Sequence, residues 1–363
     1  MKRQRALLRA DAFWLPPEVW AAVLARLGVY ALYRGCATVC RQWLTLLPAC
    51  VHVIGYQDVF PMPVTLVERF VALRHLDLSE VGATRHTNQS HHITDTCVSR
   101  LVSLTSLDLG FNWHITGASL RSLTNLSALD LLCNTVIGDA DLAPLTQLTC
   151  LDLQDNECIS GAALTCLTNL TSLHLCYNER IRDDDLAKMS ALTALDLSIT
   201  RGITGYGLRH LSRLTSLCLN YAVGDVDCRI IASLTQLRTL DVRQLGYSYF
   251  WWPRMTNLTA LNICGNDGMR GCGDVCLRSL TNLTELHMCS TGVSGPALAR
   301  LTNLRTLTLT LDELRLAASD LATLPRLQRI EVSDAHTEPS SRTLRLLARR
   351  LSHVTLHFHV GDI

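Results

Sequence analysis

The feature that most constrains this chain is a short segment that recurs every 22 residues. The clearest copies are LTSLDLGFN (104–112), LSALDLLCN (126–134), LTCLDLQDN (148–156) and LTSLHLCYN (170–178). The central leucines keep this interval through six copies, at Leu107, Leu129, Leu151, Leu173, Leu195 and Leu217. Because no single copy can bury its apolar positions alone, the spacing predicts a stack of similar units that cover one another.

Weaker copies extend the array in both directions. Their centres are Leu76, Leu240, Leu261, Leu286, Leu307, Ile330 and Val354. Together with the six clear copies they make about 13 units, mostly of 22 residues, over residues 70–363. The segment CVHVIGY (50–56), within a linker at 49–69, is a candidate degenerate capping unit.

Each unit joins a strand pattern to a helix pattern. The central L-x-L alternates with period two, which is typical of a half-buried strand, and leucines three apart, such as Leu120 and Leu123, indicate a short helix. Three residues stand where a helix N-cap is expected, namely Thr116, Ser160 and Thr204. Parallel strands stack about 4.8 Å apart whereas packed helices need about 8–10 Å. The stack must therefore curve, with strands on its inner face.

This pattern resembles the leucine-rich-repeat family. The asparagines that end the clear copies match the family's asparagine ladder, whose side chains satisfy backbone groups at the turn: Asn112, Asn134, Asn156 and Asn178. The resemblance implies an α/β solenoid, a curved horseshoe with parallel strands on the concave face and short helices on the convex face. Thr200, Ala222 and Leu245 replace the asparagine, so we expect looser middle coils.

A different pattern precedes the repeats, in LPPEVWAAVLARLGVYALYRGCATVCRQWLTLL (15–47). Its apolar spacing indicates three short helices, and roughly 35 residues cannot normally bury enough surface to be stable alone. The order L-P-x-E, apolar pairs and V-C-x-x-W resembles an F-box, which we expect at 11–48. The matching positions are Leu15, Pro16, Glu18, Val19, Val23, Leu24, Leu27, Leu32, Val39, Cys40 and Trp43.

The resemblance implies that the F-box docks on the Skp-type adaptor of an SCF-type cullin–RING ubiquitin ligase. The expected adaptor contacts are the matching positions other than Cys40. The chain would be the substrate-recognition subunit, with catalysis in other subunits. In agreement with this expectation, phosphate-binding, nucleophile-elbow and zinc-protease motifs are absent from the sequence. Three alternatives are open: the F-box residues only cap the solenoid, the chain is a non-catalytic binding scaffold or inhibitor, or the concave face carries an unrecognised enzyme site.

Two columns of residues are expected to line the concave face and bind a protein target. The first follows the central leucines and holds Asp77, Asp108, Asp130, Asp152, His174, Asp196, Cys218 and Asp241. Carboxylates one strand spacing apart repel by on the order of 1 kcal/mol in water, and a basic target segment would relieve this repulsion. The alternative, which the family pattern favours, is that aspartate simply belongs to the L-D-L consensus and has no target. The second column holds Phe111, Tyr177 and Tyr221, either as interface anchors or as edge packing.

The charge balance and the lack of long apolar runs limit the classes of molecule that this chain is expected to bind. The formal net charge is +1, from 33 basic and 32 acidic residues, and no apolar run approaches the ~18 residues of a membrane span. We therefore expect a protein partner, not nucleic acid or a membrane.

The 15 cysteines are scattered singly, which favours reduced thiols in the cytoplasm or nucleus. Sequons at Asn125, Asn169, Asn257 and Asn282 fall at one repeated position and indicate structural repetition rather than glycosylation. We expect no cofactor and no metal. His86, His91 and His92 fit a mobile loop in the 79–100 insertion better than a metal site, and YSYFWWP (247–253) fits irregular core filling better than a binding patch.

Overall fold

The computed structural model describes residues 53–54, 70, 72–79, 93–221, 226–245, 255–266, 273–334, 346–347 and 349–360. The chain forms two compact units, Met1–Thr149 and Cys150–Ile363. The expected F-box at 11–48, the histidines at 86–92 and the aromatic segment at 247–253 lie outside the described residues.

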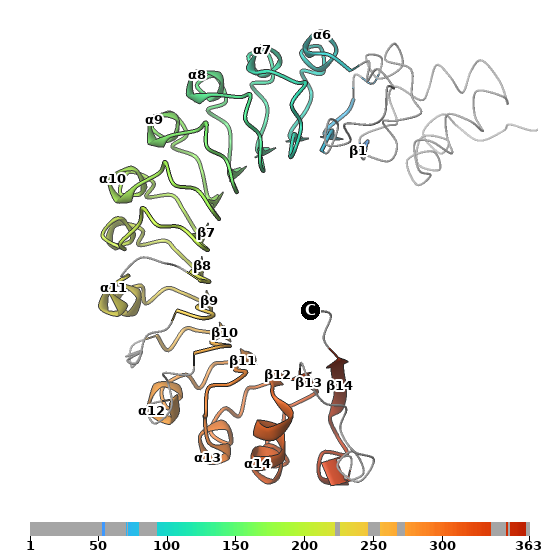
Figure 1. Ribbon diagram of the computed structural model, residues 1–363, viewed down its shortest axis with the longest axis vertical. Coiled ribbons are helices and arrows are strands. Elements are labelled where there is room, and N and C mark those ends of the chain that lie inside the picture. Colours follow the sequence, from blue (N-terminus) through green and yellow to red (C-terminus); the bar gives the residue numbers. More distant parts are fainter. Residues whose placement is uncertain are drawn as a thin grey trace, which may run out of the picture. The chain divides into compact units, whose positions relative to one another are not determined.

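The first unit alternates short parallel strands with one-turn helices (Figure 1). The strands are β1 (Val53–Ile54), β2 (His75–Asp77), β3 (Ser106–Asp108) and β4 (Ala128–Asp130), and the helices are α6 (Asp95–Val98), α7 (Gly117–Leu120) and α8 (Asp139–Leu142). Ile54 pairs with Leu76, and Leu76 pairs with Leu107. The candidate capping unit therefore contributes a strand in register with the repeats.

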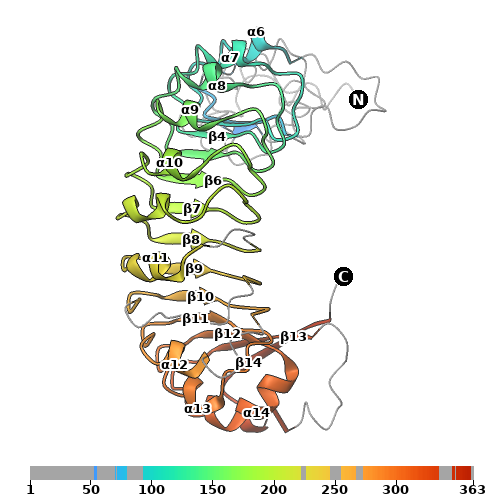
Figure 2. The ribbon, with the colours of Figure 1, turned by 60° about the vertical axis from the view of Figure 1, so that its left-hand side comes forward.

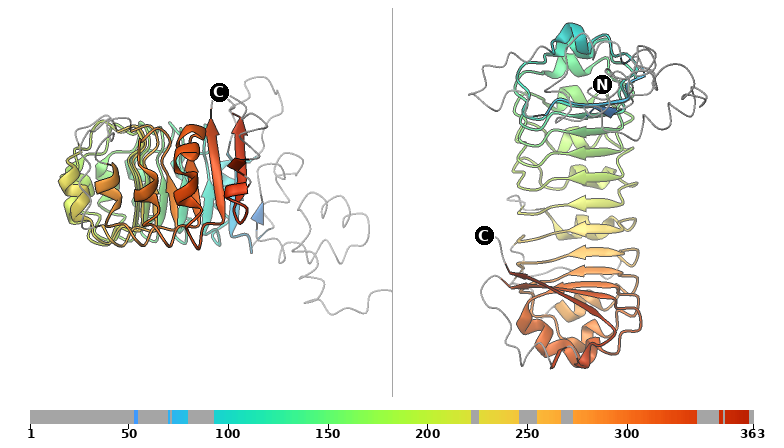
Figure 3. Two further views of the ribbon diagram at one scale, coloured as in Figure 1. Left: turned by 90° about the horizontal axis from the view of Figure 1, so that it is seen from below. Right: turned by 90° about the vertical axis from the view of Figure 1, so that its right-hand side faces the viewer.

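The second unit continues the same alternation, as Figure 2 shows. Its strands are β5 (Cys150–Asp152), β6 (Ser172–His174), β7 (Ala194–Asp196), β8 (Ser216–Cys218), β9 (Thr239–Asp241), β10 (Ala260–Asn262), β11 (Glu285–His287), β12 (Thr306–Leu309), β13 (Arg329–Asp334) and β14 (Thr355–Val360). Its helices are α9 (Gly161–Leu164), α10 (Asp183–Leu186), the 3-10 helix η1 (Gly207–His210), α11 (Cys228–Ser233), α12 (Gly273–Leu277), α13 (Gly295–Leu298) and α14 (Leu311–Leu321). Strands lie on one side of this unit and helices on the other (Figure 3).

The predicted central leucines pair in register, with one exception at the C-terminal end. Within the second unit the pairing runs strand by strand from Leu151 to Ile330. Ile330 then pairs with Leu356, so the predicted centre at Val354 is wrong. Leu356 and Phe358 supply the alternating apolar pair of β14, two residues later than expected.

Repeated leucines fill the core between strands and helices. In one unit Leu104, Leu107 and Leu109 are each no more than 1% exposed. Burial of such a side chain contributes roughly 1.5–3 kcal/mol, and it is available only when a neighbouring unit covers it. The stacking inferred from the sequence thus has its physical cause in this shared core.

Two of the three expected N-caps are confirmed. The side chains of Thr116 and Ser160 accept hydrogen bonds from the backbone N–H groups of Ala118 and Ala162, each at 3.3 Å. The third expectation, Thr204, is wrong because the helix of its unit begins later, at Gly207. Thr204 instead donates its hydroxyl and its backbone N–H to the Asp183 carboxylate of the preceding unit.

The asparagine ladder forms as expected. Asn134 is fully buried, and its amide nitrogen donates to the carbonyl of Asn112 at 2.7 Å. Its amide oxygen accepts from the N–H groups of Val136 and Ile137. Asn178 repeats the pattern by donating to the carbonyl of Asn156 at 2.9 Å. Each of these side chains therefore closes its own turn and ties it to the preceding unit.

The ladder changes where asparagine is replaced. Thr200 donates to the carbonyl of Leu197, three residues back in its own unit, so this bond does not join units. Asn266 restores the inter-unit link by donating to the carbonyl of Val242 at 2.8 Å, and its oxygen accepts from the Leu245 N–H.

Candidate protein-binding faces

The residues that follow the central leucines lie in strand register within each unit. In the first unit Asp77 pairs with Asp108, and Asp108 with Asp130. In the second unit the paired column runs through Asp152, His174, Asp196, Cys218 and Asp241. All eight are half-buried. Of the predicted target-binding residues, Asp108, Phe111 and Asp130 belong to the first unit, and Asp152, His174, Tyr177, Asp196, Tyr221 and Asp241 to the second.

The aspartates of this column have a structural role. One oxygen of Asp108 accepts the backbone N–H of Gly110 at 2.9 Å, and Asp152 and Asp196 accept the N–H two residues ahead at 2.8 Å. Each carboxylate thereby holds the turn that leaves its strand. This local bond explains why aspartate recurs in the L-D-L pattern without any target.

Charge on this face of the second unit is balanced at β9 and β13. Asp241 forms an ion pair with Arg243 at 3.2 Å, and further along Arg329 pairs with Glu331 at 2.8 Å. Among the described residues no ion pair involves Asp152 or Asp196, which lie on either side of His174. Burial raises the pKa of Asp152, and Asp196 adds to this effect while His174 opposes it. A cationic group placed at the stretch from β5 to β7 would therefore be stabilised by these carboxylates.

The aromatic column occupies a left-handed turn. Phe111, Tyr177 and Tyr221 have φ values of 55°, 58° and 53°. The same position in other units is occupied, also with positive φ, by Cys133, Asp155, Ile199, Gln244, Gly265 and Ser290. This conformation costs roughly 1–2 kcal/mol for a residue with a side chain. Tyr177 is 52% exposed and Tyr221 45%, so packing at the edge leaves both available for contact.

Several thiols line the same face of the second unit. Burial, followed by nearby aspartates, raises the pKa of Cys176 to about 11. Burial also raises the pKa of Cys218 to about 11, although Ser198 opposes the shift. Cys264 differs, because hydrogen bonds from the Cys289 side chain and backbone lower its pKa; the backbone N–H lies 3.2 Å from the sulfur. Cys264 is thus the thiol of this set that ionises most readily.

Neither a metal site nor a spanning helix is found in the described part of the chain. No group of three or more His, Cys, Asp or Glu residues there could hold a metal ion. Within the same residues no helix is both long and apolar enough to cross a membrane. The predicted adaptor contacts, from Leu15 to Trp43, lie outside the described residues.

A second ladder, which we did not predict, runs along the edge where the strands begin. Asn125 and Asn257 donate their amide nitrogens to the carbonyls of Val102 and Thr235, at 3.0 and 2.9 Å. Asn282 and Asn303 make the same bond to Thr256 and Thr281. The repeated Asn-Leu pair ahead of each strand was the signal for it. For Asn125, Asn257 and Asn282 the interpretation as structural repetition is confirmed, because each side chain joins neighbouring units.

Comparison with known proteins supports the fold. No protein-family model and no curated protein matches the chain. A leucine-rich-repeat protein of Leptospira interrogans is 16% identical, with a TM-score of 0.53 over 96% of this chain and 100% of that chain. The internalin inlF of Listeria monocytogenes is 20% identical, with a TM-score of 0.45 over 94% and 96% of the two chains. The described parallel strands, short helices and asparagine ladder are those of a leucine-rich-repeat solenoid.

Proposed function

We propose that this chain is the substrate-recognition subunit of an SCF-type cullin–RING ubiquitin ligase. The F-box at 11–48 binds the Skp-type adaptor, and the strand-lined face of the repeats binds a protein target. The chain itself is not an enzyme, since catalysis belongs to other subunits, and it acts in the cytoplasm or nucleus. Support for the adaptor half of the proposal comes from the sequence, in the L-P-x-E and V-C-x-x-W motifs.

The main structural support for target binding is the column of side chains that lie in strand register on β5–β7 of the second unit. Asp152 and Asp196 are held in place by backbone bonds, and burial raises the pKa of Asp152. Tyr177 projects from the adjoining turn and is 52% exposed. Fixed carboxylates beside an exposed aromatic ring form a surface that suits a basic segment carrying Lys or Arg side chains.

The two halves can be tested separately. Co-purification with a Skp-type adaptor should be lost in the Leu15→Ala/Pro16→Ala double variant and retained in Asp152→Asn/Asp196→Asn. Capture of targets from cells treated with a proteasome inhibitor should be lost in Asp152→Asn/Asp196→Asn and retained in the Leu15→Ala/Pro16→Ala double variant. If the unaltered chain binds no adaptor, the ligase role is refuted. Target capture without adaptor would then support the alternative, a non-catalytic scaffold or inhibitor.

A further inference from the structure

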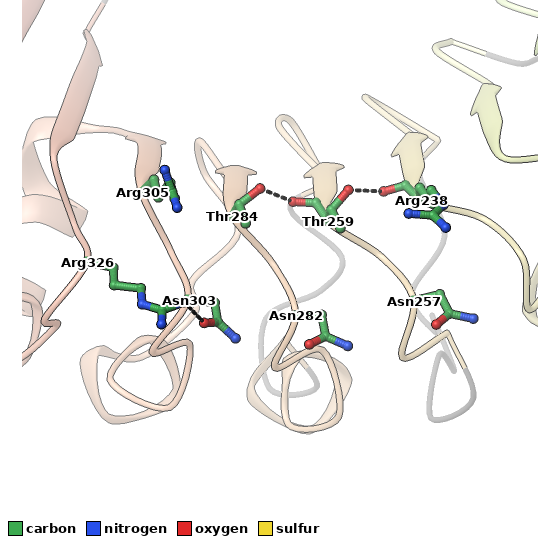
Figure 4. A pocket seen from close by; sticks show the side chains of 8 residues that line it. All are labelled: Arg238, Asn257, Thr259, Asn282, Thr284, Asn303, Arg305 and Arg326. Atoms are coloured by element: carbon green, nitrogen blue, oxygen red, sulfur yellow. Dashed lines mark hydrogen bonds between the residues drawn. The ribbon is translucent and has the colours of Figure 1, made fainter.

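The strand-entry edge of the second unit carries an open hollow of about 300 Å³. It is lined by two rows of side chains, drawn in Figure 4. The first row, two residues before the strand centres, holds Arg238, Thr259, Thr284 and Arg305, and the second row holds Asn257, Asn282, Asn303 and Arg326. An adjoining hollow of about 520 Å³ shares Arg305 and Arg326 and adds His353. We call the two hollows together the basic edge.

The basic edge lacks a balancing negative charge. No carboxylate belongs to either lining, and in the described part of the chain no ion pair involves its three arginines. Arg238 and Arg305 are exposed, while Arg326 donates to the amide oxygen of Asn303 at 2.7 Å. This contrasts with Arg243 and Arg329, whose carboxylate partners lie on the neighbouring face.

The asparagines of the second row add hydrogen-bond donors to this positive charge. Each amide nitrogen carries two N–H groups, and the ladder uses one of them, as in the 2.9 Å bond from Asn257 to the Thr235 carbonyl. The bonds of Asn282 and Asn303 to backbone carbonyls leave the same second N–H group. Because the ladder fixes these side chains, their remaining donors are already positioned for an acceptor on a ligand.

The distance between the arginines along the first row indicates what kind of anionic ligand could contact both of them. Arg238 and Arg305 are separated by three strand spacings of about 4.8 Å, about 14 Å in all, which is too far for one small anion to bridge. An extended peptide advances about 3.3 Å per residue, so side chains four positions apart are about 13 Å apart and point to the same side. Two carboxylates with that spacing would reach the two arginines together.

We propose that the basic edge binds an extended acidic segment of a protein partner, with carboxylates four residues apart opposite Arg238 and Arg305. Arg326, beside Arg305, binds the flanking backbone or a further carboxylate. The surface is distinct from the acidic column on β5–β7, so a partner could engage the two with segments of opposite charge. The proposal shares with the proposed function only the idea of a protein partner and does not require the F-box.

Fluorescence anisotropy with the full chain at low ionic strength tests this inference. The probe is a labelled Gly/Ser peptide of about ten residues with two aspartates four positions apart. We expect it to bind, with its Kd raised about 3-fold by Arg238→Gln or Arg305→Gln and about 10-fold by both together. The matched control is Arg278→Gln, which removes an exposed arginine outside the hollows and should leave Kd unchanged.

Three further probes, two peptides and an oligonucleotide, decide the occupant. A peptide with the two aspartates adjacent, and one with asparagine in place of both, should bind more weakly than the spaced peptide. Equal binding by the adjacent-aspartate peptide would overturn the spacing argument. Tighter binding by a single-stranded oligonucleotide of equal length would assign the basic edge to nucleic acid instead. The peptide assay contains no adaptor, so absence of peptide binding would overturn this inference without bearing on the ligase proposal. Conversely, absence of adaptor binding would refute the ligase proposal without bearing on this inference.

Discussion

A substitution at Gly117 would test how closely neighbouring repeats of the solenoid pack. An added Cβ there would overlap the carboxylate carbon and both oxygens of Asp141, which belongs to the next helix. Asp141 is itself engaged, since it accepts the backbone N–H of Gly138 at 3.0 Å. Gly117→Ala therefore forces Asp141 to turn away and leaves the start of α8 without its acceptor.

The expected magnitude follows from these contacts. Loss of a helix cap costs about 1 kcal/mol, and overpacking costs about 1–3 kcal/mol. Replacing glycine in a helix usually stabilises by roughly 0.5–1 kcal/mol, which opposes these effects. We expect Gly117→Ala to lower the free energy of unfolding by about 1–3 kcal/mol net.

Urea unfolding followed by circular dichroism measures the global change, and hydrogen exchange of α7 and α8 measures the local one. Gly138→Ala is the matched control, because its added Cβ would lie 3.9 Å from the same carboxylate, and it should change stability by less than about 1 kcal/mol. In the Gly117→Ala/Asp141→Ala double variant the two costs should not add. If Gly117→Ala proves as stable as the parent chain, the close approach of helices α7 and α8 is wrong.

Three further predictions concern the ladder, the turns and the thiols. Asn134→Ala, which leaves buried backbone groups unsatisfied, should destabilise by about 2–4 kcal/mol in urea unfolding, against at most about 1 kcal/mol for the exposed Asn257→Ala. Gln244→Gly, at φ 51° and with an exposed side chain, should raise the unfolding midpoint because relief of roughly 1–2 kcal/mol of strain exceeds the roughly 0.5–1 kcal/mol entropic cost of glycine; an unchanged or lower midpoint contradicts it. In mass-spectrometric mapping of alkylation, the rate at Cys264 should reach half its maximum below pH 9, and the rate at Cys218 should reach half its maximum only near its pKa of about 11. Since the pKa of Cys218 is raised by folding from 9.0, its contribution to stability is complete below pH 9 and lost as the pH rises through about 11.

The sequence predicted those parts of the fold that depend on local periodicity. The spacing of leucines identified the strands, and the asparagine positions identified the first ladder, because each requires the same residue type in every unit. The left-handed conformation at Tyr177 and Ile199 was not predictable, since the favoured glycine occurs at that position only in Gly265. The basic edge was also missed: Arg238 and Arg305 are 67 positions apart in the sequence, by subtraction of their numbers, and only stacking places them along one edge.

The direction of the two ladders has a consequence for synthesis on the ribosome. The side-chain amides of Asn134, Asn178 and Asn257 all donate to carbonyls about one unit nearer the N-terminus. A newly made unit therefore emerges after its acceptors have been made, and the preceding unit serves as its template. Growth from the N-terminal end satisfies each amide as it appears, whereas a chain that lost an internal repeat would have to find a substitute acceptor only at the new junction, because every later repeat still follows its usual neighbour.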